Sequence, residues 1–112
     1  MSYDVRITDQ AEEDLRSIYA YIAFHLHSVE NASAQLNRLE DEIYSLDQFP
    51  DRYRLYEKEP WYSRGVRRFP VDHYCVFYLP NKETMRVDII RVLYAGRDID
   101  RIMAETEQEL TK

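Results

Sequence analysis

The alternation of apolar and polar residues predicts a strand and then two helices in the first half of the chain. Residues 3–8 (YDVRIT) alternate tyrosine, valine and isoleucine with polar residues, which is typical of a short half-buried strand. Asp9 and Glu12 then fit a capping box at the start of a helix. The apolar residues of this helix recur at helical spacing on one face: Ala11, Leu15, Ile18, Tyr19 and Ile22.

The pattern breaks near His25 and resumes in a second helix. Ser28 fits the N-cap of this helix, which should end near residues 49–50. Its apolar residues follow at steps of three and four: Leu36, Leu39, Ile43 and Leu46. Two helices joined by a short turn form an antiparallel hairpin, and the apolar face of the hairpin needs a sheet to cover it.

Three strands are predicted in the second half of the chain, over residues 66–71, 74–79 and 85–94, and residues 52–56 fit a short edge strand. The strand over 74–79 is apolar on both faces, so we place it in the centre of the sheet. Ile89 and Ile90 are adjacent and break the alternation, which indicates a β-bulge.

The last strand ends in a sequence, YAGRD, that favours a turn followed by a new helix. Gly96 lets the backbone turn where a side chain would obstruct it, and Asp98 fits the N-cap of a short helix over 99–105. Arg97 is then held at the junction between strand and helix. Its guanidinium would present five hydrogen-bond donors beside the sheet.

These elements predict an α+β fold, with a strand, a helical hairpin and three to four further strands. The helices would pack on one face of a two-layer antiparallel sheet, and the other face would be only partly covered. With 112 residues, the chain fits a single core. We assign one domain to residues 1–104 and an acidic C-terminal tail to residues 105–112.

The distribution of charge separates the two halves of the chain. Residues 1–50 hold three Lys/Arg against ten Asp/Glu, a balance of −7, whereas residues 51–104 hold eleven against eight, a balance of +3. Anions would therefore dock on the second half. The chain has no apolar run of about 18 residues and no charged-then-apolar leader, so we expect no membrane span and a cytoplasmic location.

The sequence gives no reason to expect a metal or a cofactor. Cys75 is the one cysteine and has apolar neighbours, which favours a packed thiol over a reactive one. His25 and His27 are two residues apart and would point to different sides of a helix. No glycine-rich phosphate loop and no paired-cysteine spacing occurs.

Two segments, VRRFPVDHYCVFYLP and VDIIRVLYAGRDIDRIM, resemble the C-terminal signature of the RelE/ParE superfamily, which comprises toxins of type II toxin-antitoxin systems of the plasmid-stabilisation type. With the first strand and the hairpin, the resemblance covers roughly residues 3–103. It implies a toxin that inhibits growth when free and forms a hetero-oligomer with a cognate antitoxin. Within the superfamily, one branch poisons DNA gyrase and another cleaves messenger RNA on the ribosome.

The resemblance to the cleaving branch is incomplete. Arg68 and Arg97 match basic positions of that branch, but Cys75 stands where it has another basic residue and Met103 stands near its C-terminal tyrosine. Cleavage at a 2′-hydroxyl needs a base, a proton donor and cations. Two arginines supply only the cations, so a nuclease would need Tyr94 or His73 as a substitute base. For His73, the simpler interpretation is an exposed or turn-stabilising residue.

We therefore favour a toxin that acts by binding, with gyrase as the target. The alternatives are a ribosome-dependent endoribonuclease and an inert interaction module. The alternative for Arg97 is an ion pair with Asp98 or Asp100. Only one of Arg67 and Arg68 can face the open side of the sheet. We expect Arg68 and Arg97 to converge on one exposed patch. The predicted target-binding residues are Arg67, Arg68, Arg91, Tyr94 and Arg97.

Overall fold

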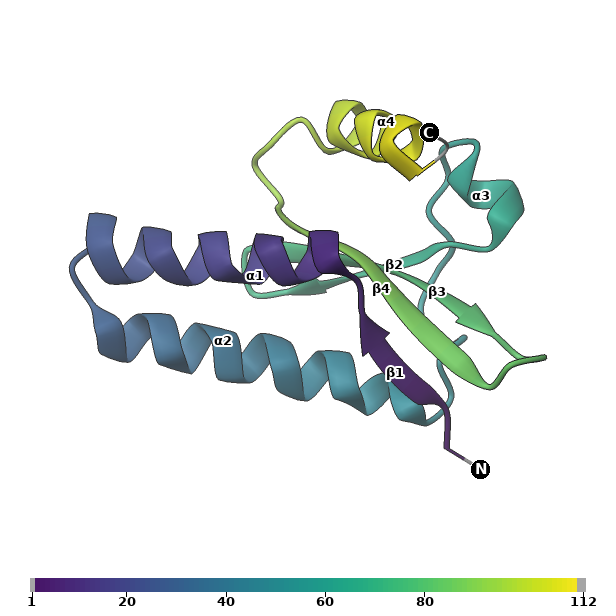
Figure 1. The fold of residues 1–112 in the computed structure, drawn as a ribbon, viewed down its shortest axis with the longest axis horizontal. Coiled ribbons are helices and arrows are strands. Elements are labelled where there is room, and N and C mark those ends of the chain that lie inside the picture. Colours follow the sequence, from purple (N-terminus) through teal and green to yellow (C-terminus); the bar gives the residue numbers. More distant parts are fainter. Residues whose placement is uncertain (1, 111–112) are drawn as a thin grey trace.

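The computed structural model describes residues 2–110, with side chains as far as residue 107. Its elements run in the order strand, helical hairpin, short helix, three strands and C-terminal helix (Figure 1). Their bounds are β1 Asp4–Ile7, α1 Asp9–Ala20, the π-helical turn η1 Tyr21–His25, α2 Val29–Tyr44, the 3-10 turn η2 Ser45–Asp47, α3 Trp61–Arg64, β2 Arg67–Val71, β3 Tyr74–Asn81, β4 Arg86–Tyr94 and α4 Ile99–Leu110.

The four strands form one sheet in the order β1-β4-β3-β2. The predicted α+β fold is confirmed, and β3 is an inner strand as expected. The sheet is mixed rather than wholly antiparallel, because β1 pairs with β4 in parallel. The chain passes through the whole hairpin and two other strands between β1 and β4, so no tight turn forces these two strands to run in opposite directions. The expected edge strand over 52–56 is reduced to an isolated bridge between Leu55 and Arg67.

Polar side chains fix both helices of the hairpin at their N-termini. Ser28 caps α2 as predicted, since its hydroxyl accepts a hydrogen bond from the backbone of Asn31 at 3.1 Å. The cap of α1 is Thr8 rather than Asp9: the Thr8 hydroxyl accepts from the backbone of Ala11 at 3.3 Å and donates to the carbonyl of Ile89 at 2.7 Å. Thr8 therefore joins the start of α1 to β4, where β1 ends.

The hairpin packs on one face of the sheet (Figure 1). The core on this side, called here the hairpin core, contains side chains from α1, α2 and all four strands. Leu15, Leu39, Ile43, Phe69, Val76 and Ile89 are among its buried members. Burying these apolar surfaces is the main favourable contribution to folding.

Helices also cover the second face of the sheet, which corrects the expectation that they pack on one face only. Trp61 of α3 and Met103 of α4 are buried against Phe77 and Leu93 in a second core. The helix expected over 99–105 continues to residue 110, so most of the predicted tail is helical. Residues 111–112 of that tail lie outside the described residues.

The predicted β-bulge is confirmed in β4. Phe77 pairs with Arg91 and Tyr78 pairs with Ile89, so Ile90 is the extra residue. As a result Ile89 and Val92, which are three residues apart, both lie in the hairpin core, while Ile90 lies in the second core. Among the helices that the structure describes, none is long and apolar enough to span a membrane.

Candidate functional site

The junction between β4 and α4 contains the residues that the sequence singled out. The backbone N–H of Arg97 donates to the carbonyl of Tyr94 at 3.1 Å, which closes the turn. A Cβ atom on Gly96 would lie 2.5 Å from the Tyr94 ring, and real Cβ atoms do not approach so closely. Glycine is therefore needed here for the ring of Tyr94 to lie over the turn. The sequence predicted that a side chain at position 96 would obstruct the turn.

A groove of about 330 Å³ lies between α1 and the end of β4, and we call it the Arg97 groove. Three tyrosines line it, and two of them are half exposed: Tyr21 at 55% and Tyr94 at 51%. The rings of Tyr74 and Tyr94 meet edge to face, with 6.0 Å between centroids. The groove thus combines aromatic surface with the guanidinium of Arg97 and the carboxylate of Asp14.

Arg97 is exposed, and no acidic side chain in the described part of the chain forms an ion pair with it. The two carboxylates that were considered as its partners are occupied elsewhere. Asp98 lies 3.5 Å from the guanidinium of Arg101, and Asp100 accepts a hydrogen bond from the hydroxyl of Tyr56. The charge of Arg97 is therefore available to a partner molecule.

Arg68 lines a different concavity, which we call the Arg68 concavity, together with Arg54, Cys75 and Ala95. The expectation of one patch shared by Arg68 and Arg97 is wrong. Arg68 lies opposite Phe77 in the sheet, and the ring of Phe77 is in the second core. Tyr94 lies opposite Tyr74, which packs against the hairpin core. Directly opposed residues of antiparallel strands point to the same face, so Arg68 lies on the face of the second core, whereas Tyr94 of the Arg97 groove lies on the hairpin side. Among the described residues, Tyr74 is the one that lines both concavities.

The two arginines of β2 point to opposite sides, as predicted. Arg67 donates from Nη1 to the carbonyl of Tyr53 at 2.6 Å. Arg68 lies 5.6 Å from the ring centroids of both Tyr56 and Phe77, and its Nη1 is 3.8 Å from the carboxylate of Glu57. Arg67 thus helps to fix the loop before β2, while Arg68 remains partly accessible.

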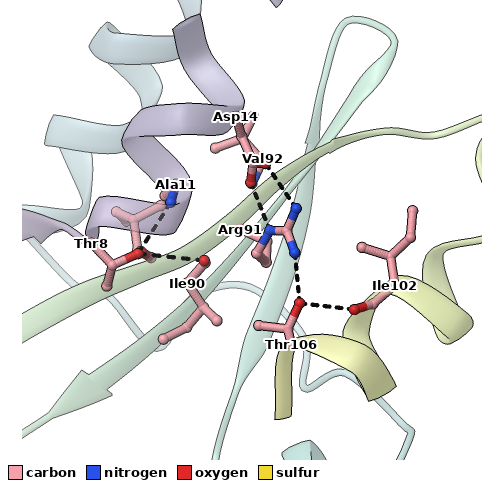
Figure 2. Close-up of polar contacts among 9 residues, drawn as sticks. Thr8, Ala11, Asp14, Ile90, Arg91, Val92, Ile102 and Thr106 are labelled. Carbon is pink, nitrogen blue, oxygen red and sulfur yellow. Dashed lines mark hydrogen bonds and ion pairs between the residues drawn. The ribbon is translucent and has the colours of Figure 1, made fainter. Parts of the chain in front are cut away.

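Arg91 is buried, with 8% of its surface exposed, and each of its three guanidinium nitrogens donates a hydrogen bond inside the protein (Figure 2). Nε and Nη2 both donate to the carboxylate of Asp14 at 2.8 Å, and Nη1 donates to the hydroxyl of Thr106 at 2.6 Å. Asp14 also accepts from the backbone of Val92 at 2.9 Å. We call Asp14, Arg91 and Thr106 the Arg91 clamp, since they join α1, β4 and α4.

The remaining candidates for catalysis are not assembled into one site. His73 is exposed in the turn between β2 and β3. Of the four residues considered for cleavage, only Tyr94 and Arg97 line the same groove.

Cys75 is a packed thiol, as predicted, with 3% of its surface exposed. Burial raises its pKa, and the nearby Arg68 offsets part of that increase. The described residues contain no cluster of three or more histidine, cysteine, aspartate or glutamate side chains that is arranged to hold a metal ion.

Sequence reasoning missed Tyr21 and Tyr74 as lining residues and Asp14 as the partner of Arg91. The high number of tyrosines, ten in 112 residues, was visible but did not indicate which of them would share a groove. Asp14 did leave a signal: it is a carboxylate on the apolar face of α1, next to Leu15 and one turn from Ala11 and Ile18. A charge in that position calls for a buried partner.

Comparison with known proteins identifies the family and the fold. The family model described as the ParE toxin of type II toxin-antitoxin system, parDE, matches residues 5–99. A search of curated proteins finds no match.

Several solved structures share the fold. A chain of the chromosomal ParDE system from P. aeruginosa has a TM-score of 0.69 and 18% identity, covering 85% of this chain and 98% of its own. A chain of the toxin-antitoxin complex RelBE2 from Mycobacterium tuberculosis has a TM-score of 0.62 and 22% identity, covering 84% and 99%. A double arginine mutant of the E. coli toxin RelE in the free state has a TM-score of 0.64 and 14% identity, covering 97% and 98%.

Proposed function

This chain belongs to the ParE toxin family of type II toxin-antitoxin systems, and from that premise we propose that it inhibits growth by binding DNA gyrase. The proposed contact surface contains the exposed residues of the junction, Tyr94 and Arg97, with Arg68 as a further cation on the second face of the sheet. Gyrase is a cytoplasmic enzyme, so the toxin would act in the cytoplasm.

The observation that carries this proposal is the state of Arg97. It is an exposed guanidinium without an acidic partner among the described residues, at the edge of a groove lined by tyrosines. Arginine and tyrosine are, with tryptophan, enriched at the energetic centre of protein interfaces. Two residues that were predicted to bind the target are left out. The guanidinium of Arg91 is buried and paired with Asp14, and that of Arg67 is held by the carbonyl of Tyr53.

The alternative of a ribosome-dependent endoribonuclease receives less support. Cleavage would require cations and a proton-transfer group around one phosphate. Arg68 and Arg97 line separate concavities, and His73 lines neither. Tyr94 and Arg97 alone would supply one phenol and one cation.

We also propose that a cognate antitoxin neutralises the toxin by laying an amphipathic helix or an extended segment across the hairpin or the sheet. One solved relative of the same fold is a toxin-antitoxin complex. The end of the hairpin offers apolar surface for such a segment, because four large apolar residues are exposed there: Tyr21, Phe24, Leu26 and Val29.

The test is to incubate the purified protein with gyrase and supercoiled plasmid, and separately with translating ribosomes. We expect gyrase-dependent DNA breaks and intact messenger. Messenger cut at the decoding site would establish the nuclease alternative instead. If overproduction of the chain without a partner leaves growth unaffected, the chain is an interaction module and both toxin mechanisms are excluded.

A further inference from the structure

The short bridge beside β2 places two arginines directly opposite each other. Leu55 is bridged to Arg67, and the backbone N–H of Arg68 donates to the carbonyl of Arg54 at 3.0 Å. In an antiparallel pair, opposed residues have their side chains on the same face. Arg54 and Arg68 therefore project together on the face that carries α3 and α4.

Both arginines line the Arg68 concavity, which has a volume of about 150 Å³. Cys75 also lines it and is buried, and both guanidiniums are close enough to its thiol to favour the thiolate electrostatically. The Arg68 side chain is only 22% exposed and lies near the rings of Tyr56 and Phe77, which limits its freedom. The two guanidiniums thus share a small, partly preformed hollow.

The positive charge of this hollow is poorly neutralised. Two like charges directly opposite each other on a sheet are destabilising. Arg68 has only the exposed carboxylate of Glu57, at 3.8 Å, and Arg54 has no acidic partner within the described residues. Asp72 also lines the concavity, but its carboxylate accepts hydrogen bonds from Gln35 and Arg38.

We propose that Arg54 and Arg68 form a binding site for a phosphate group, either a free phosphate or a phosphate of a nucleic-acid backbone. Guanidinium groups donate paired hydrogen bonds that match the oxygens of a phosphate, and two of them more than balance the single charge of a backbone phosphate and match the two charges of a free phosphate dianion. A bound phosphate would also remove the repulsion between the two arginines. This site is a different concavity from the Arg97 groove. It gives Arg68, which is also part of the proposed gyrase contact surface, a second role that does not depend on gyrase.

The first test is a titration of the isolated full-length protein with inorganic phosphate, at constant ionic strength maintained with chloride. Amide NMR shifts report binding at Arg54, Arg68, Cys75 and Ala95. We expect saturable shifts in the wild type and binding that is about 10- to 100-fold weaker in Arg54→Gln, because a charge-assisted hydrogen bond is lost. Arg6→Gln is the matched control, since Arg6 is an exposed arginine of β1, and its affinity should stay within about twofold of wild type.

The second arm replaces inorganic phosphate with a short DNA oligonucleotide. If the oligonucleotide competes with phosphate and needs Arg54, the ligand is a backbone phosphate; if only inorganic phosphate binds, the ligand is a free phosphate. Shifts that do not saturate, or that are the same in Arg54→Gln and wild type, overturn the proposal. In chloride buffer without phosphate, Arg54→Gln should be at least as stable to unfolding as the wild type, because it removes a repulsion between two arginines. A lower stability of the variant would also contradict the proposal. No gyrase is present, so failure here leaves the proposed function untouched.

Discussion

Arg91 and Arg97 are six residues apart in the sequence, yet they have different roles in the molecule. Arg91 is buried and donates hydrogen bonds to Asp14 and Thr106 (Figure 2). Arg97 is exposed beside a groove lined by tyrosines. Both belong to the half of the chain that carries the net positive charge, residues 51–104. Only the position of a carboxylate, 77 residues away along the chain, makes the first one structural.

The comparison shows how a basic segment divides between stability and recognition. A buried pair contributes little net stability but makes the protein depend on both partners, because either one alone would be an uncompensated charge in the interior. An exposed guanidinium costs the fold little to keep or to lose. Substitutions in the Arg91 clamp should therefore act on folding, and substitutions at the junction should act on binding.

The largest expected effect on stability is that of Asp14→Ala. It leaves the Arg91 guanidinium buried without a counter-charge and removes the acceptor for the Val92 amide, so we expect a loss of about 3–5 kcal/mol in the free energy of unfolding. Denaturant titration measures this loss. Asp4→Ala is the control, because it breaks an exposed pair of similar length, 2.9 Å, and should cost about 1 kcal/mol or less. Equal losses in the two variants would show that the clamp is not energetically distinct.

A second buried polar group should make stability depend on alkaline pH. Burial raises the pKa of Tyr78 to about 12, and its hydroxyl donates to the carbonyl of Pro50 at 2.6 Å. The folded protein then holds the proton more tightly than the unfolded chain, whose tyrosine titrates near about 10. The resulting contribution, about 2–3 kcal/mol, is present below pH ~10 and is lost as the pH rises towards ~12.

Tyr78→Phe tests this assignment. It should make the alkaline loss of stability shallower, and at neutral pH it should cost about 1–3 kcal/mol because the Pro50 carbonyl loses its donor. Unfolding curves between pH 7 and 12 provide the measurement. A variant with the same pH profile as wild type would contradict the role of the Tyr78 phenol.

At the junction, Gly96→Ala should have a smaller effect. The new Cβ would meet the ring of Tyr94, which is half exposed and can rotate away. We expect a cost of about 1 kcal/mol, together with a changed ring position that is visible in the aromatic NMR signals of Tyr94. Unchanged Tyr94 signals would mean that the ring does not lie over the turn.

Arg97→Ala should have the smallest effect on stability. Because its guanidinium is exposed and has no acidic partner in the described part of the chain, we expect a change within about 0.5 kcal/mol. Thermal and denaturant unfolding would both show it. A loss comparable to that of Asp14→Ala would place Arg97 in the fold rather than on a contact surface.

Much of the fold followed from local patterns, because their causes are local. The cap at Ser28, the bulge near Ile90 and the turn at Gly96 were all predicted from a few neighbouring residues. The predictions were wrong for two features that depend on residues far along the chain, the cap of α1 and the direction of β1. Thr8 rather than Asp9 caps α1, and its hydroxyl also donates to the carbonyl of Ile89 in β4. The direction of β1 depends on its pairing with β4, which lies far along the chain.

The candidate site was less predictable, because it depends on which face of the sheet each side chain takes. Arg68 and Arg97 were expected to converge, but they line different concavities, because the register of β2 and β3 puts Arg68 on the face of the second core. Arg91 was expected on the surface because its partner in α1 lies 77 residues earlier in the sequence. In both cases the residue type indicated a functional charge, but contacts with residues far along the chain determined whether the side chain is exposed.

The most direct test of the account is a dose-response of gyrase-dependent DNA cleavage for the wild type, Arg97→Ala and Arg101→Ala. Arg101 is an exposed arginine of α4 that pairs with Glu105, so it controls for the loss of one positive charge. We expect breaks with the wild type and with Arg101→Ala, and a requirement for at least about tenfold more Arg97→Ala protein. Equal potency of Arg97→Ala and wild type, or messenger cleavage in place of gyrase-dependent breaks, would contradict the account.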